Sequence, residues 1–108
     1  MDRSIQIRAL ASTQRLTILR LLAEPGRHFG DQWSADPKRV GVCMTLIASA
    51  LQIAQPTASR HLGILAQAGF ITVTKHLKWS YCKRDEVAIR QYLDWLATEL
   101  HAPAPRVP

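Results

Sequence analysis

The stretch from residue 45 to residue 69 constrains the fold more than any other part of this sequence. Apolar residues recur at helical spacing over residues 45–53, and a break of about three residues then precedes Pro56, which suits the first turn of a second helix. That helix is expected to run to Ala68 and to end at Gly69, which readily adopts the left-handed conformation of a C-terminal cap. Two short helices joined by a tight turn predict a helix-turn-helix.

A basic β-hairpin is expected directly after this helix pair. Residues 70–74 are rich in β-branched side chains, and residues 79–82 are typical of a partner strand, with residues 75–78 joining the two. A hairpin that follows a helix pair in this way forms the wing of a winged helix-turn-helix. The sequence therefore predicts that fold.

The remaining segments complete the expected order of elements. Residues 2–10 suggest a short, weakly amphipathic helix, and Ser12 is expected to cap a second helix, followed by an irregular stretch over residues 25–37. Residues 39–43 predict a short strand, and a final amphipathic helix opens at Asp85. The fold class predicted is mainly α with a small β-hairpin, in the order α-α-β-α-α-β-β-α.

The charge distribution indicates a polyanionic partner. The chain of 108 residues has a formal net charge of +6, and no acidic residue lies between Asp36 and Asp85. A surface of this kind is neutralised by phosphates, and binding then releases counterions. The alternative is a solvated basic face that only aids solubility. The basic residues of this acid-free stretch are Lys38, Arg39, Arg60, Lys75, Lys78, Lys83 and Arg84.

The start of the second helix of the pair carries side chains that suit base recognition. Gln can bond adenine, Arg can bond guanine, and the methyl group of Thr can meet that of thymine. Cations of the wing are expected to reach phosphates, and His76 or Lys78 at its tip could enter the minor groove. The predicted DNA-binding residues are Gln55, Pro56, Thr57, Ser59 and Arg60 in the helix, and Lys75, His76, Lys78, Lys83 and Arg84 in the wing.

Three segments of the sequence resemble the ArsR family of bacterial repressors. Residues 9–22 are similar to its opening helix, residues 55–65 to its recognition helix, and residues 68–71 to its entry into the wing. The resemblance covers roughly residues 5–100, and the recognition-helix segment is its most specific part. His61 stands at a recurrent histidine position of that helix, where a structural ring hydrogen-bonded to backbone is favoured over a base-reading one.

The resemblance implies a homodimeric repressor that leaves a double-stranded DNA operator when an effector binds. It also implies that the first and last helices form the dimer interface, and the apolar stripe of the last helix is wider than one small core requires. The effector itself is not indicated. The residues predicted at the dimer interface are Ile5, Ala9, Ile89, Tyr92, Leu93, Leu96 and Leu100.

Metal sensing of the types known in this family is not expected. The family's Cys-Val-Cys thiolate pair is matched here by Cys43-Met44-Thr45, which leaves one thiolate for a soft metal. The last helix offers Asp94, Glu99 and His101 without a second histidine one turn away. His28, Asp31 and Asp36 are potential ligands that loop composition explains better. No metal and no cofactor are predicted.

The two cysteines, Cys43 and Cys82, leave two interpretations open. If the strand before the helix pair lies beside the second strand of the hairpin, the thiols could approach within disulfide range. Lys83 and Arg84 could then lower the thiol pKa of Cys82 and make it reactive. The alternative is that both cysteines are small buried hydrophobes without redox function.

Other functional classes receive less support from the sequence. It contains no paired-carboxylate spacing, no phosphate-binding glycine loop and no nucleophile–histidine arrangement, so no enzyme is predicted. The main rival is a winged helix used for protein–protein contact without specific DNA binding. Residues 1–101 are expected to form one DNA-binding and dimerisation domain, and residues 102–108 a flexible Pro-rich tail. No membrane span is predicted, and the expected location is the cytoplasm.

Overall fold

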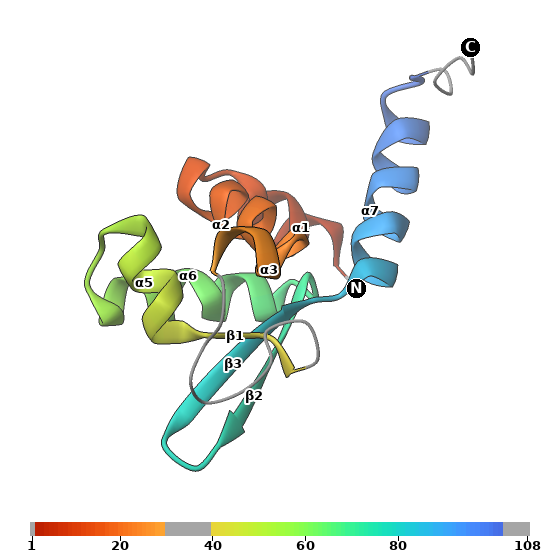
Figure 1. Ribbon diagram of the computed structural model, residues 1–108. Helices are drawn as coiled ribbons and strands as arrows, with labels where there is room; N and C mark the ends of the chain where they lie inside the picture. Colours follow the sequence, from red (N-terminus) through yellow and green to blue (C-terminus); the bar gives the residue numbers. More distant parts are fainter. Residues whose placement is uncertain (1, 30–39, 103–108) are drawn as a thin grey trace.

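The computed structural model describes residues 2–29 and 40–102 of the chain, and it confirms the predicted winged helix-turn-helix (Figure 1). The described helices and strands follow the predicted order, with one additional helical turn after the second helix. They are α1 (Arg3–Leu10), α2 (Thr13–Ala23), α3 (Pro25–His28), β1 (Val42–Cys43), α5 (Met44–Leu51), α6 (Gln55–Gln67), β2 (Ile71–His76), β3 (Trp79–Arg84) and α7 (Glu86–Glu99).

Local signals in the sequence account for most helix boundaries. Ser12 caps α2 by accepting a hydrogen bond from the backbone N–H of Arg15, and Asp85 caps α7 by accepting one from Ala88. Helix α2 ends before Pro25, and Pro25 starts α3, because its fixed φ suits the first turn of a helix. The irregular stretch predicted from residue 25 therefore begins with one helical turn. The rest of that stretch, from residue 30, lies outside the described residues.

The three strands form an antiparallel sheet in the order β1-β3-β2. Val42 pairs with Cys82 and Cys43 with Tyr81, which confirms the predicted position of the first strand beside the second strand of the hairpin. Gly41 makes this approach possible: its φ is +101°, and a Cβ there would lie 2.5 Å from the carbonyl oxygen of Cys82. The strand predicted over residues 39–43 is reduced to Val42–Cys43, and Arg39 lies outside the described residues.

The hairpin is longer and its turn tighter than the sequence suggested. His76 pairs with Trp79, so only Leu77 and Lys78 form the turn. Of β2, only Ile71 is buried, and the residues after it are exposed. The outer part of the wing therefore stands away from the body of the protein (Figure 1).

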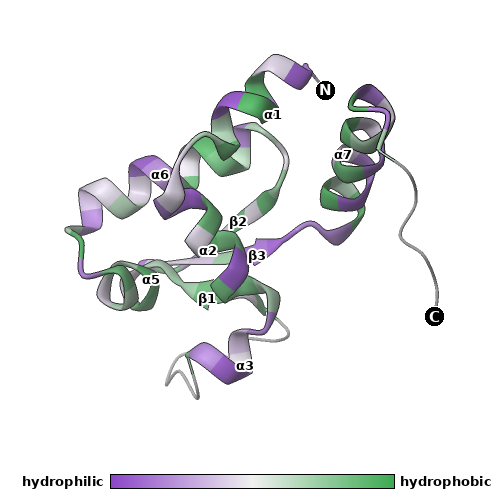
Figure 2. Cartoon of the chain, turned by 90° about the horizontal axis from the view of Figure 1, so that it is seen from above, coloured by the Kyte–Doolittle hydropathy of each residue, from purple (hydrophilic) through white to green (hydrophobic). Residues whose placement is uncertain are grey.

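The hydrophobic core lies where the helices meet the root of the sheet. Its largest fully buried side chains are Phe70, Ile18, Ile47, Leu65, Val42 and Cys82. Helix α7 extends from this body and carries hydrophobic residues along its length (Figure 2). Its one fully buried residue is Tyr92, whose ring lies edge-on to that of Phe70 at a centroid distance of 5.2 Å. Among the described residues, no helix combines the length and apolar character that crossing a membrane would require.

Candidate nucleic-acid interface

Helix α6 separates a buried apolar face from an exposed polar one. Ala58, Leu62 and Leu65 lie in the core, whereas the residues at the start of the helix that were predicted to contact DNA all lie on the surface. These exposed residues are Gln55, Pro56, Thr57, Ser59 and Arg60. Because apolar residues occupy the other face, α6 can present its polar side chains outward without burying an unsatisfied group.

The wing supplies exposed basic side chains, three of them at or beside its turn and Lys83 nearer its root. Lys75, His76, Lys78 and Lys83 are exposed, and the ammonium group of Lys78 lies 5.1 Å from the ring centroid of Trp79. That cation–π contact orients the lysine while leaving it at the surface. The wing therefore carries positive charge along the part that stands away from the body.

A concave surface joins α6 to the wing, and we call it the α6–wing groove. Its volume is about 260 Å³. Ser59 and Gly63 of α6 form one wall, and Val73 and Ser80 of the wing form the other. Gly63 has no neighbour within 4 Å of the position a Cβ would take. The remaining lining residues are Met44, Leu62, Ala66 and Cys82.

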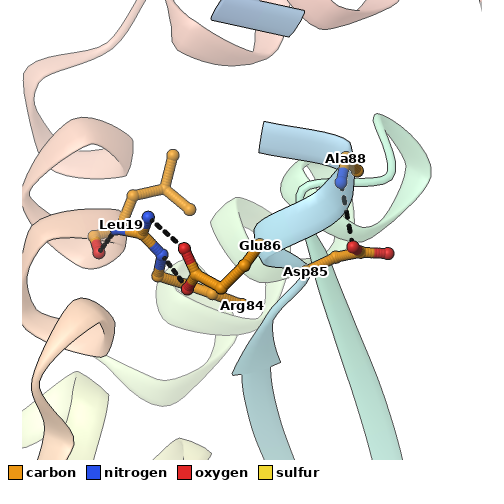
Figure 3. Close-up of polar contacts among 5 residues, drawn as sticks. All are labelled: Leu19, Arg84, Asp85, Glu86 and Ala88. Atoms are coloured by element: carbon orange, nitrogen blue, oxygen red, sulfur yellow. Dashed lines mark hydrogen bonds and ion pairs between the residues drawn. The ribbon is translucent and has the colours of Figure 1, made fainter. Parts of the chain in front are cut away.

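Arg84 has a different role from the phosphate contact expected of it (Figure 3). Its guanidinium donates two hydrogen bonds of 2.8 Å to the Glu86 carboxylate and one of 3.0 Å to the backbone carbonyl of Leu19. Its side chain is only 18% exposed. Arg84 therefore connects the end of the wing to α2 and to the start of α7, and three of its five N–H donors are used within the chain.

His61 is held by side chains of α2 and not by backbone as expected. Nη1 of Arg15 lies 3.1 Å from its Nδ1, and Oε1 of Gln14 lies 2.6 Å from its Nε2. Because a guanidinium can only donate, Nδ1 accepts and Nε2 carries the proton that is donated to Gln14. Burial lowers the pKa of His61, and the charges of Arg15 and Arg60 lower it further, which favours this neutral ring.

Arg15 extends the same network to α1. Its Nε donates to the carbonyl of Ala9 at 2.6 Å, and its Nη2 donates to that of Arg8 at 3.2 Å. The sequence did not single out Gln14 or Arg15, because they lie 47 and 46 residues from His61 and no local pattern links them. Helix α6 is thereby joined to both α1 and α2.

The structure disfavours the redox pair, which was one of the two interpretations of the cysteines that the sequence left open. Both are free and buried, and the pairing of Val42 with Cys82 places the Cys43 and Cys82 side chains on opposite faces of the sheet. Burial, together with the neighbouring Cys43, raises the pKa of the Cys82 thiol to about 12. The expected lowering by Lys83 and Arg84 is wrong, because desolvation of the buried thiol outweighs the nearby positive charge.

The residues expected at a dimer interface fall into three groups. Ala9 and Tyr92 are buried in the core of the chain, so a partner subunit cannot bury them further, and their assignment to the interface is corrected. Ile5, Ile89 and Leu96 are half-buried against the core. Leu93 is 42% exposed and Leu100 is 67% exposed. The last two leave an apolar surface on α7.

The described residues contain no group of three or more His, Cys, Asp and Glu side chains able to hold a metal ion together. His28 is exposed at the end of α3. The other two candidate ligands of that region, Asp31 and Asp36, lie outside the described residues. Asp94 of α7 pairs with Arg90, at 3.3 Å between Oδ1 and Nε.

A helix pair with a polar, exposed second helix beside a basic hairpin defines the class of this protein as a winged helix-turn-helix DNA-binding transcriptional regulator. Comparison with known sequences then gives its family. Residues 42–73 match the sequence model of the bacterial regulatory proteins of the arsR family. The chain is 43% identical over 93 residues to YbzH of Bacillus subtilis, an uncharacterized HTH-type transcriptional regulator, covering 86% of this chain and 93% of the relative. The chain belongs to the ArsR family.

Solved structures share the fold at lower sequence identity. A crystal structure of an ArsR family transcriptional regulator aligns with a TM-score of 0.68 and 19% identity over 91% of each chain. The homodimeric winged helix-turn-helix DNA-binding domain from Mycobacterium bovis aligns with a TM-score of 0.61 and 23% identity, over 97% of this chain and 85% of the other. These similarities support the arrangement of helices and wing described above.

Proposed function

We propose that the protein is a repressor that binds an inverted-repeat operator as a homodimer, reading bases with α6 and contacting phosphates with the wing. The observation that carries the proposal is the exposed polar start of α6, whose Ser59 lines the α6–wing groove opposite Val73 and Ser80 of the basic hairpin. A helix of this kind presents its N-terminal side chains to base edges in the major groove. Binding is then its whole activity, and no catalytic step is assigned.

The proposed contacts follow from exposure and chemistry. Gln55, Pro56, Thr57, Ser59 and Arg60 face the major groove, and Arg60 is the residue best suited to a guanine. Lys75, His76, Lys78 and Lys83 lie beside phosphates. Arg84 is left out of the set because its guanidinium is bonded to Glu86 and Leu19.

The dimer is proposed to form through the exposed apolar surface of α7, with α1 beside it. Leu93 and Leu100 of α7 and Ile7 of α1 are each more than 40% exposed, and covering such residues is favourable in water. The homodimeric domain from Mycobacterium bovis, which shares the fold, supports a dimer. Two copies would place their α6 helices in major grooves about 34 Å apart on one side of the duplex.

Selection of bound sequences from random duplexes, followed by titration of the recovered operator and a scrambled duplex, tests the DNA-binding part. We expect an inverted repeat and a preference for it that persists at physiological salt, as specific binders show. Arg60→Ala should cost about 1–3 kcal/mol and relax the preference at one base pair of each half-site. Lys78→Ala should weaken binding to both duplexes equally and reduce the salt slope by about 1.

A winged helix used only for protein–protein contact predicts a different result. In that case no sequence would be enriched, and Arg60→Ala and Lys78→Ala would have equal effects on any residual binding to random DNA. That outcome would remove the DNA-reading role of α6 from the proposal.

The dimer has its own test. Leu93→Asp combined with Leu100→Asp places two charges on the exposed apolar surface of α7, so sedimentation should show monomers and operator affinity should fall. Val87→Asp is the matched control, because Val87 is 67% exposed on a different face of the same helix. Circular dichroism checks that each variant is folded. A wild-type protein that sediments as a monomer at micromolar concentration would contradict the proposed dimer.

A further inference from the structure

Leu77 at the tip of the wing is the most exposed large apolar residue of the described chain, at 81% of its surface. It lies in a two-residue turn with Lys78, at the end of the hairpin farthest from the body (Figure 1). An apolar side chain in this place recovers little free energy from burial within its own chain. Leu77 lies between His76 and Lys78, the two tip residues that the sequence predicts to approach the minor groove.

The backbone conformation at position 77 makes a leucine there more unusual. Its φ is +56°, in the left-handed region that two-residue hairpin turns normally fill with glycine, asparagine or aspartate. A bulky apolar residue is a genuine outlier in that region. Both the exposure and the φ of Leu77 therefore disfavour it within the free protein, and a polar residue such as asparagine would satisfy both.

The surroundings of Leu77 indicate what kind of molecule it meets. Lys75, His76 and Lys78 flank it on the two strands and in the turn, and all three are exposed. An apolar side chain flanked by two lysines complements duplex DNA, whose phosphates line the groove walls while the faces of the base pairs are apolar.

The length of the wing allows this contact while α6 occupies the major groove. A strand of six residues spans about 20 Å at roughly 3.3 Å per residue. The adjacent minor groove lies half a helical turn away, or about 17 Å. The minor groove is only about 6 Å wide, which admits a single side chain from the hairpin tip and not the whole hairpin.

We propose that Leu77 enters the minor groove beside each half-site and wedges between two neighbouring base pairs, while Lys75 and Lys78 contact the phosphates on either side. The contact opens a base step without any hydrogen bond to a base. It therefore selects for flexible pyrimidine–purine steps, TpA or CpA, about five base pairs from the centre of the α6 site. This inference rests on the proposed DNA-binding function and adds a specificity-determining residue to it.

The test compares Leu77→Asn with Leu77→Met on the selected operator. Asparagine tolerates positive φ and is polar, so this variant should be at least as thermally stable as the wild type but bind the operator roughly tenfold more weakly. Methionine keeps an apolar side chain and should retain wild-type affinity within about threefold. The salt slope should stay unchanged in both variants, because neither substitution alters a charge.

A fluorescent base gives a direct readout of the wedge. With 2-aminopurine placed in the flanking step, wild type and Leu77→Met should raise the fluorescence by unstacking the base, and Leu77→Asn should not. Replacing the flexible step by a stiff ApA step should weaken the wild type but leave Leu77→Asn unaffected.

The outcomes separate the two proposals. If the wild type binds its operator specifically and Leu77→Asn matches it in affinity and fluorescence, the wedge is overturned while the proposed function remains. If no duplex is preferred over scrambled DNA, both are overturned.

Discussion

The recognition helix and the wing lie on two sides of one groove, yet they are attached to the protein in different ways. Helix α6 is held along its length by Ala58, Leu62 and Leu65 in the core, and His61 joins it to α2. The wing is buried at its root but its β2 strand is exposed beyond Ile71. Reading base edges requires fixed geometry, whereas contacting phosphates requires an element that extends from the body, and the two attachments match the tasks proposed for α6 and the wing.

The largest difference is expected when one apolar side chain is shortened in each element. Leu65→Ala removes a fully buried side chain of α6 and should lower the free energy of unfolding by about 2–5 kcal/mol, because a cavity is left in the core. Val73→Ala in the wing should cost less than about 1 kcal/mol, since Val73 is 44% exposed. Urea denaturation measures both. Equal losses would show that the wing is as firmly packed as α6.

The root of the wing depends on Arg84. Arg84→Ala removes the bonds to Glu86 and to the Leu19 carbonyl and should lower the unfolding free energy by about 1–3 kcal/mol, with faster hydrogen exchange at the end of β3 and the start of α7. Arg90→Ala is the matched control. The side chains of Arg90 and Asp94 are both exposed, so loss of their ion pair should lower the unfolding free energy by at most about 0.5 kcal/mol.

A comparison of Arg84→Ala with Lys78→Ala distinguishes the structural role of Arg84 from a role in phosphate binding. Because the Arg84 guanidinium is bonded within the chain, Arg84→Ala should leave the salt slope of DNA binding unchanged. A slope reduced as much as in Lys78→Ala would restore the phosphate contact that the sequence suggested.

Gly63 allows stability and binding to be separated within α6. A methyl group there meets no atom of the chain, so Gly63→Ala should raise the unfolding free energy by about 0.5–1 kcal/mol through helix propensity. Because Gly63 lines the α6–wing groove, the same methyl group should reduce operator affinity. Gln67→Ala changes another exposed residue of α6, and its operator affinity should stay close to that of the wild type. Unchanged affinity in Gly63→Ala would indicate that DNA does not approach this part of the helix.

The smallest expected effect concerns the protonation of His61. Its pKa is lowered in the folded protein, by burial and then by Arg15 and Arg60, so the unfolded chain binds the proton more readily. The stability that depends on the neutral ring is therefore fully present above the unfolded pKa of about 6.5 and is lost as the pH falls through that value towards the lowered folded one. Urea denaturation at pH 7.5 and pH 5.5 should show this loss in the wild type and a smaller one in His61→Gln. Equal pH dependence in the two proteins would contradict the neutral His61 inferred from the Arg15 contact.

Much of the fold could be predicted because its signals are local. Pro56 and Gly69 bracket α6, the spacing of Ala58, Leu62 and Leu65 fixes its buried face, and β-branched residues mark β2. The exposure of Arg60 and its neighbours follows from that same spacing. The two-residue turn of the wing and the helical turn α3 were not predicted. Both depend on hydrogen bonds that a residue pattern does not specify.

What the sequence determined by itself was therefore the order of elements, the outward face of the recognition helix and the excess of positive charge near it. Tertiary structure decided which long polar side chains remain available to a partner. Arg84 and Lys78 look alike in the sequence, but only Arg84 meets a carbonyl 65 residues away. Likewise Tyr92 and Leu93 are neighbours on α7, but only Tyr92 packs against Phe70, whereas Leu93 is exposed. The physical reason is that periodicity encodes the direction in which a side chain points, whereas burial, pKa and hydrogen-bond partners depend on what the rest of the chain brings there.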